Sequence, residues 1–222
     1  MKTAERILVT SLALFNQHGE PNVTSVDIAM ELDISPGNLY YHFKGKEIIV
    51  SALFELYQKQ MTQLLNASIG RELSVEEFFY YVYLILEKIH LFQFFYRSPA
   101  DLADKYPDIH KGFVKLIATQ EAVIERQIRQ FADNQQFNAG AAQQSQLVEV
   151  FSLVFSQSTN FYMLKGIDES HQVYRSLAMI LAACLPYLSI DSEELLNLQA
   201  AVAEHAMGGL VDDSVRQALQ EN

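Results

Sequence analysis

The sequence predicts an all-α protein. Its 222 residues include only 5 prolines and 9 glycines, and half of the residues are apolar. Long apolar stretches repeat with helical spacing, and capping residues mark several helix starts. The length is sufficient for one large or two small domains with a substantial core. The first helix is expected over 2–18, with Leu8, Leu12 and Phe15 on one stripe and Gly19 as its stop.

One segment, residues 24–46, has the pattern of two short capped helices joined by a tight turn. Thr24, with Asp27 three residues later, forms a capping box and predicts the start of a helix. Ile28 and Ala29 then fall on one side, where they can pack against a neighbouring helix. This arrangement is the outline of a helix-turn-helix DNA reader.

The second helix of this segment is expected over 36–43. Ser35 supplies its N-cap, and Leu39 and Phe43 should face inward because they lie four residues apart. An asparagine can pair with adenine, and tyrosine or histidine side chains can bond phosphates or base edges. Glycine lets DNA approach the backbone, and lysines can hold phosphates. The outward residues with these properties are Gly37, Asn38, Tyr40, Tyr41, His42, Lys44 and Lys46.

Three motifs in the segment resemble the TetR/AcrR family of bacterial transcriptional regulators. They are T-x-x-x-I-A over 24–29, I-S-x-G over 34–37 and L-Y-Y-H-F-K-x-K-E over 39–47, within a match spanning roughly residues 3–55. The resemblance implies a homodimer with an N-terminal three-helix DNA-binding domain, here 1–47. It also implies a larger helical domain for ligand binding and dimerisation, here 48–222.

By the same resemblance, Thr24 and Ser25 would touch phosphate and Lys46 would hold the DNA backbone. The groove-facing residues would be Pro36, Gly37, Asn38, Tyr40, Tyr41 and His42, and Ser35 and Lys44 complete the candidate set. Two positions depart from the family pattern. Asp33 occupies the turn position often held by glycine, and it tolerates a left-handed backbone less well than glycine does. Asn38 replaces the usual threonine, which changes the base preference expected at that contact.

The charge of the chain fits DNA binding poorly. The net charge is −11, and residues 1–60 hold five basic and seven acidic side chains, whereas an autonomous DNA-binding domain is usually basic. Either positive charge is local, at Lys44 and Lys46, or the protein does not bind DNA; we favour the first. If roughly two or three basic groups per subunit meet phosphates, the slope of log K against log[salt] should be about −4 to −6 per dimer.

The rest of the chain is predicted to form a larger helical domain. Ser74 with Glu77 is a second capping box, and Asp191 with Glu194 is a further cap. A break is expected over 69–73 around Gly70. The expected helices are 46–67, 74–97, a short one from Asp101 to a break near Pro107, 108–136, 141–165, 170–188 with a kink at Pro186, 191 to about 208, and a short one from Asp212.

Two of these helices, over 147–164 and 173–188, carry apolar residues around most of their circumference. Such helices need neighbours on every side. Burial within a monomeric bundle is one interpretation. A four-helix interface with a second copy, as the family resemblance implies, is the one we favour. The candidate interface residues are Phe151, Phe155, Leu177, Ile180, Leu181 and Leu185.

Aromatic side chains cluster over 78–96 and recur further along the chain. An aromatic stripe is more often plain core, but it can line an apolar cavity whose few hydroxyls orient a ligand. The family resemblance favours the cavity, and we expect a small apolar or aromatic effector. The candidate lining residues are Phe78, Tyr81, Phe92, Phe95, Tyr96, Phe113, Phe151 and Phe155.

Catalytic and metal-binding motifs are absent from the sequence. It contains no G-x-S-x-G, H-E-x-x-H, C-x-x-C or nucleotide-binding loop. Glu87 and His90 form one Glu-x-x-His pair, the spacing used by di-iron bundles, without a second. The lone Cys184 excludes an internal disulfide, is typical of a protein in a reducing cytoplasm and is expected to be a core residue.

The apolar run 78–86 is too short to cross a membrane. No cofactor, metal or membrane partner is expected.

These features together predict a dimeric, cytoplasmic, one-component transcriptional regulator. We expect a repressor that reads a palindromic DNA operator and is released by a small molecule. The competing class is a helical carrier that binds a small molecule but not DNA, and the acidic balance is its main support. An enzyme of the four-helix carboxylate type depends only on Glu87 and His90.

Overall fold

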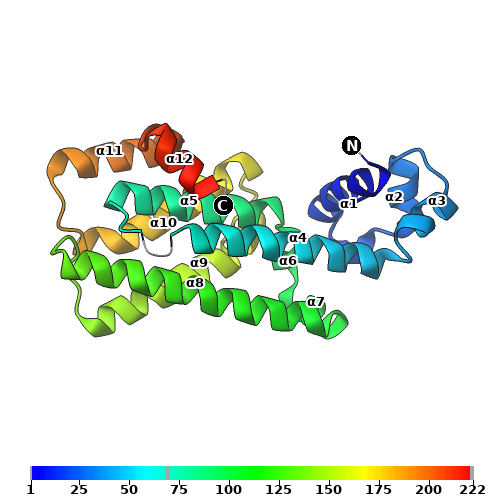
Figure 1. Cartoon of the computed structure of the whole chain (residues 1–222), viewed down its shortest axis with the longest axis horizontal. Coiled ribbons are helices and arrows are strands. Elements are labelled where there is room, and N and C mark those ends of the chain that lie inside the picture. Colours follow the sequence, from blue (N-terminus) through cyan, green and yellow to red (C-terminus); the bar gives the residue numbers. More distant parts are fainter. Residues whose placement is uncertain (1, 69–70, 221–222) are drawn as a thin grey trace. The chain divides into compact units, whose positions relative to one another are not determined.

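The computed structural model describes residues 2–68 and 71–220 and is built of helices (Figure 1). It confirms the all-α class, and the β contact found in the described residues is an isolated bridge between Phe137 and Leu188. The chain divides into two compact units. Unit 1 comprises residues 1–60 and 92–112, and unit 2 comprises 61–91 and 113–222. A domain boundary at residue 47 stays a prediction.

Unit 1 contains the helix-turn-helix segment. Its elements are α1 (Thr3–His18), the 3-10 turn η1 (Glu20–Asn22), α2 (Ser25–Glu31), α3 (Pro36–His42), α6 (Phe94–Arg97), α7 (Pro99–Lys105), and the first parts of α4 (Lys46–Ala67) and α8 (Pro107–Asp133). The buried face of α1 is centred on Ile7, Ser11 and Phe15, whereas the expected stripe residues Leu8 and Leu12 are half-buried. Gly19 ends α1 with a φ of 82°, as predicted.

The helix expected over 74–97 is instead two helices, α5 (Val75–Leu91) and α6. The interruption contains neither proline nor glycine, so the cause lies in tertiary contacts. Within unit 1, the side-chain Oδ1 of Asn16 accepts the backbone N–H of Phe94 at 3.1 Å, and the Phe15 and Phe94 rings lie 5.2 Å apart. The Asn16 amide thus replaces a helical hydrogen bond, which allows the chain to turn at this point.

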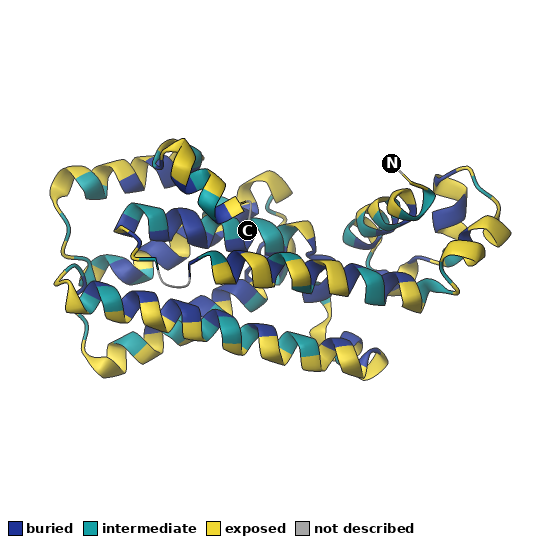
Figure 2. Ribbon diagram, in the orientation of Figure 1, coloured by how far each residue is buried: buried dark blue, intermediate teal, exposed yellow. Residues whose placement is uncertain are grey.

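Unit 2 is a bundle whose inner helices are buried on several faces (Figure 2). It contains α5, α9 (Ala141–Leu164), α10 (Glu169–Cys184), the 3-10 turn η2 (Leu185–Tyr187), α11 (Ser192–Ala203), the 3-10 turn η3 (Met207–Gly209) and α12 (Asp213–Gln220). Helix α10 packs against both α9 and α5. The Ser74–Glu77 capping box forms as predicted, with hydrogen bonds of 2.8 and 3.1 Å.

The boundaries of most other helices lie within about three residues of the prediction, and two helices end earlier than that. Helix α10 ends at Cys184, and Pro186 lies in η2. Helix α11 ends at Ala203, well before the expected residue 208, because His205 takes a left-handed conformation with φ 58°. Of the predicted break over 69–73, residues 69 and 70 lie outside the described residues. No helix in the described part of the chain is both long and apolar enough to span a bilayer.

Candidate nucleic-acid interface

Helix α2 begins at the predicted capping box. The Asp27 carboxylate accepts hydrogen bonds from the backbone N–H of Thr24 at 2.8 Å and from its hydroxyl at 2.7 Å. In return, Thr24 Oγ1 accepts the N–H of Asp27 at 3.2 Å. These bonds hold the pKa of Asp27 below its ordinary value. Ile28 and Ala29 are buried, so the predicted packing face of α2 is confirmed.

The turn between α2 and α3 uses the aspartate noted in the sequence. Asp33 has a φ of 52°, the left-handed conformation that glycine adopts more readily. After the turn, Ser35 Oγ accepts the N–H of Asn38 at 3.1 Å, and Pro36 is the first residue of α3. The local chemistry of these four residues thus sets both the turn and the start of α3.

Helix α3 presents a polar and aromatic outer surface. Its inward anchor is Leu39, which is buried, while Phe43 is only half-buried. Tyr41 is 83% exposed, and its ring meets that of His42 edge-on at 5.2 Å. The further exposed residues of the candidate set are Thr24, Ser35, Pro36, Gly37, Asn38, Tyr40, His42 and Lys44. The structure brings these side chains together on α3 and the residues that flank α2 and α3.

Two residues of the candidate set are less accessible. Ser25 is half-buried in the first turn of α2. Lys46, the first residue of α4, has a side chain that is only 14% exposed. Its ammonium donates to the backbone oxygen of Glu20 at 2.8 Å and lies 3.1 Å from Glu20 Oε1. Lys44 is therefore the exposed lysine of this pair, and Lys46 is held by a carboxylate.

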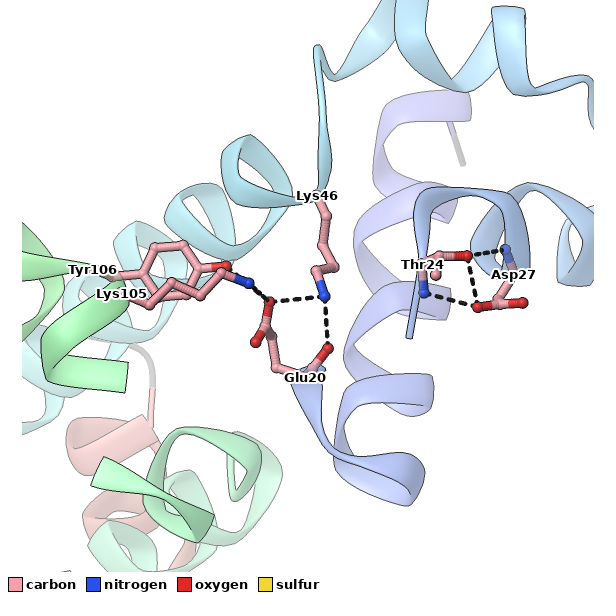
Figure 3. A network of polar contacts seen from close by, with 6 residues as sticks. All are labelled: Glu20, Thr24, Asp27, Lys46, Lys105 and Tyr106. Atoms are coloured by element: carbon pink, nitrogen blue, oxygen red, sulfur yellow. Dashed lines mark hydrogen bonds and ion pairs between the residues drawn. The ribbon is translucent and has the colours of Figure 1, made fainter. Parts of the chain in front are cut away.

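Glu20 is the residue of this region that the sequence did not reveal. It is 6% exposed, and its Oε1 also accepts the Lys105 ammonium at 2.9 Å and the Tyr106 hydroxyl at 2.8 Å (Figure 3). Burial raises the pKa of Glu20. The hydrogen bonds from Lys105, Tyr106 and Lys46 together lower that pKa by more than burial raises it, so the net shift is downward. The partners lie 26 to 86 residues away in sequence, so no local pattern could indicate them.

The predicted effector-pocket residues divide between the two units. Phe92, Phe95 and Tyr96 pack with Tyr57 in unit 1, where the two tyrosine hydroxyls lie 2.5 Å apart. In unit 2, Phe78 meets Phe131 and Phe151 at ring distances of 5.3 and 5.9 Å, and Phe151 meets Phe155 at 6.0 Å. Tyr81 is buried in unit 2, and Phe113 is half-buried. A shared pocket lined by these residues stays a prediction.

Most of the predicted interface residues are core residues of unit 2. Phe151, Phe155, Leu177, Ile180 and Leu181 are buried within the chain itself, and Leu185 is half-buried. Their burial leaves these side chains little surface for a partner, and an interface formed by them stays a prediction. The large apolar side chains of α9 and α10 that are exposed are Leu153, Phe161, Met163, Leu164 and Met179.

The remaining candidate chemical groups lie in unit 2. In the described residues, no three His, Cys, Asp or Glu side chains come together in a way that could hold a metal ion. His90 lines a small cavity of about 10 Å³ with Ser158 and Thr159. Cys184 is buried, and this burial raises the pKa of its thiol to about 12.

Known proteins resemble this chain over both its N-terminal segment and its body. The family model described as "Bacterial regulatory proteins, tetR family" matches residues 7–53, and the one described as "Bacterial transcriptional repressor" matches residues 56–196. A crystal structure of a TetR-family transcriptional regulator from Marinobacter aquaeolei VT8 is 28% identical, covers 92% of this chain and 99% of that chain, and has a TM-score of 0.79.

Curated relatives match over shorter lengths. The probable HTH-type transcriptional regulator YttP of Bacillus subtilis (strain 168) is 30% identical over 106 residues, which are 44% of this chain and 51% of YttP. The probable acrEF/envCD operon repressor of Escherichia coli (strain K12) is 28% identical over 78 residues, which are 35% of each chain. The chain thus spans about half, or less, of the length of these relatives. Together, the motifs, the helix-turn-helix geometry and the two matched regions show that this chain belongs to the tetR family of bacterial regulatory proteins.

Proposed function

We propose that the protein is a homodimeric transcriptional repressor that reads a palindromic DNA operator through α3 and releases it when a small molecule binds unit 2. One observation carries this proposal: a buried Leu39 anchors a short capped helix whose outer surface presents an amide, two phenols and an imidazole. A helix of this kind fits the major groove, where such groups can bond base edges.

The proposed contacts divide into two kinds. One group positions the helix-turn-helix segment on phosphates, and it consists of Thr24, Ser25, Ser35, Lys44 and Lys46. Asn38 can pair bidentately with adenine, and Tyr40, Tyr41 and His42 reach base edges or phosphates from the exposed side of α3. Pro36 and the side-chain-free Gly37 allow the start of α3 to approach the DNA closely.

Dimerisation is proposed through the exposed apolar side chains of α9 and α10. Leu153, Phe161 and Leu164 recur at spacings of eight and three residues on α9, which places them on one face of that helix, and Leu164 is 84% exposed. Two copies would bury these side chains against each other. A dimer also supplies two helix-turn-helix segments, one for each half of a palindromic operator. Leu164→Glu should shift the chain toward monomer in sedimentation, whereas Leu196→Glu, at an exposed leucine of α11, should not.

An apolar effector with one polar group is proposed for unit 2. Gln127 on α8 is fully buried, and its amide oxygen and nitrogen have no hydrogen-bond partner within the described residues. An unpaired buried amide costs free energy, about 1–3 kcal/mol, that a ligand with a matching donor and acceptor would recover. Mass spectrometry of small molecules that co-purify with the protein would identify such an effector.

A DNA-shift assay on the gene's own upstream region tests the proposal. We expect a sequence-specific complex that Asn38→Ala and His42→Ala each weaken. The Glu31→Ala variant, at an exposed residue of α2, is the control and should bind like the unmodified chain. No complex at low salt, together with retained small-molecule binding, would instead favour a carrier, for which the net charge of −11 is the supporting observation.

A further inference from the structure

Glu20 joins three side chains of unit 1 to one carboxylate. It lies in η1, and it accepts from Lys46 of α4, from Lys105 of α7 and from Tyr106 just after α7 (Figure 3). The Lys105–Glu20 and Lys46–Glu20 ion pairs share the same oxygen, Oε1, at 2.9 and 3.1 Å. The partners keep this buried carboxylate ionised, because they lower its pKa despite burial.

The charges of this cluster do not cancel. Two lysines face one carboxylate, so the set of Glu20, Lys46 and Lys105 carries a net charge of +1. Without the Lys105 charge, Glu20 and Lys46 would form a neutral pair. Since one pair of opposite charges has little attraction for a phosphate, the charge of Lys105 decides how much positive potential remains at the start of α4.

The hydrogen bonds of Lys46 support the same view. An ammonium has three N–H donors, and the contacts to the Glu20 carbonyl and Oε1 occupy two of them. One donor is left for a phosphate. The Tyr106 hydroxyl and the Lys105 ammonium occupy lone-pair sites of Oε1, which limits how strongly Glu20 can hold Lys46.

We propose that Lys105 and Tyr106 are positioning residues for DNA binding: the Lys105 charge offsets that of Glu20 and the Tyr106 hydroxyl occupies a lone-pair site of Oε1, which leaves the charge and one donor of Lys46 available to an operator phosphate. This inference rests on the proposed function, in which the helix-turn-helix segment binds DNA. It also predicts a way to regulate binding. Any change that moves Lys105 away from Glu20 would weaken the contact between Lys46 and phosphate, and so lower operator affinity, without altering α3.

A purely structural role for the cluster predicts different results. If Glu20 served only to tie α4 and α7 together, Glu20→Gln would reduce both stability and operator affinity. Under the proposal, Glu20→Gln removes a negative charge beside Lys46, so operator affinity should rise even though the ion pairs are lost. The two roles therefore predict opposite signs for one measurement.

The experiment measures operator affinity of the full chain by fluorescence anisotropy across a salt series. Lys105→Met should weaken binding on the order of tenfold and make the slope of log K against log[salt] shallower by about 2 per dimer, the loss of one phosphate contact per subunit. Tyr106→Phe should weaken binding less, and Lys105→Arg should restore it. The Lys105 side chain is 43% exposed, so its substitution should leave the chain folded.

Lys111→Met is the matched control. Lys111 lies in the first turns of α8, its side chain is 77% exposed, and it pairs with Asp108 at 3.0 Å. Its loss changes the net charge by the same amount as Lys105→Met, away from Glu20. The slope should therefore stay close to that of the unmodified chain.

The double variant Glu20→Gln/Lys105→Met tests whether the effect of Lys105 on operator affinity depends on the Glu20 carboxylate. Once the carboxylate is gone, Lys105 no longer competes with Lys46 for Oε1, so only its own charge is lost and its substitution should weaken binding less than in the unmodified chain. An equal effect of Lys105→Met with and without Glu20, an equal effect of Lys111→Met, or weaker binding by Glu20→Gln would each overturn the inference. If the unmodified chain binds no operator at low salt, the proposed function itself fails, which is a separate result.

Discussion

Replacing Gly112 with alanine probes the packing of α8 on α4 inside unit 1. A Cβ at Gly112 would lie 2.4 Å from Cε1 and 2.7 Å from Cζ of Phe54, where ordinary contact begins at 3.4 Å. The Phe54 ring is buried, and it meets the Phe95 ring edge-on at a centroid distance of 5.5 Å. It therefore cannot retreat without displacing a second aromatic ring.

The magnitude follows from two opposing effects. Inserting a methyl group into a packed core costs about 1–3 kcal/mol, and the short contact to a rigid ring places Gly112→Ala in the upper part of that range. Alanine returns about 1 kcal/mol through its higher helix propensity. The free energy of unfolding should thus fall by about 1–2 kcal/mol, which lowers Tm by roughly 2–8 °C in a chain of this size.

Thermal and urea unfolding followed by circular dichroism would measure this change. Gly208→Ala is the matched control, because a Cβ there meets nothing within 4 Å and the residue has no positive φ. In the Phe54→Leu background, Gly112→Ala should cost much less, since the obstructing ring atoms are gone. An unchanged or higher Tm for Gly112→Ala, or the same cost in both backgrounds, would refute the packing argument.

Three further outcomes follow from the structure. Thr24→Ala removes the side-chain cap of α2 and should lower the free energy of unfolding by about 0.5–2 kcal/mol in urea titrations; no loss would contradict the capping geometry. The pKa of Glu20 is lower in the folded chain than its ordinary 4.5, so the ionised carboxylate stabilises the fold above that pH. This contribution is lost as pH falls through the folded pKa, and acid unfolding should be less steep for Glu20→Gln than for the unmodified chain. Burial raises the pKa of the Cys184 thiol to about 12, so a disulfide reagent at neutral pH should label it only after unfolding; rapid labelling of the native chain would show that the thiol is accessible.

The sequence alone was sufficient for features built from neighbouring residues. The capping boxes at Thr24 and Ser74, the Ser35 cap and the all-α class were all predicted and are present. Each depends on hydrogen bonds between groups three residues apart, or on a helical repeat of apolar side chains. Such interactions need no knowledge of the rest of the fold. The family resemblance depended on the same local motifs and is confirmed by both matched regions.

The tertiary structure alone decided which partners the side chains meet. The apolar circumference of α9 and α10 predicted neighbours on every side, yet only the packing shows that Phe151 and Leu177 are covered by their own chain and that Leu164 is not. Lys46 is held by Glu20, whose carboxylate also binds Lys105 of α7 and the following Tyr106, both more than eighty positions from Glu20. Periodicity records how much apolar surface or charge a helix carries. It cannot specify which distant segment covers that surface or pairs that charge, because this depends on how the chain closes on itself in three dimensions.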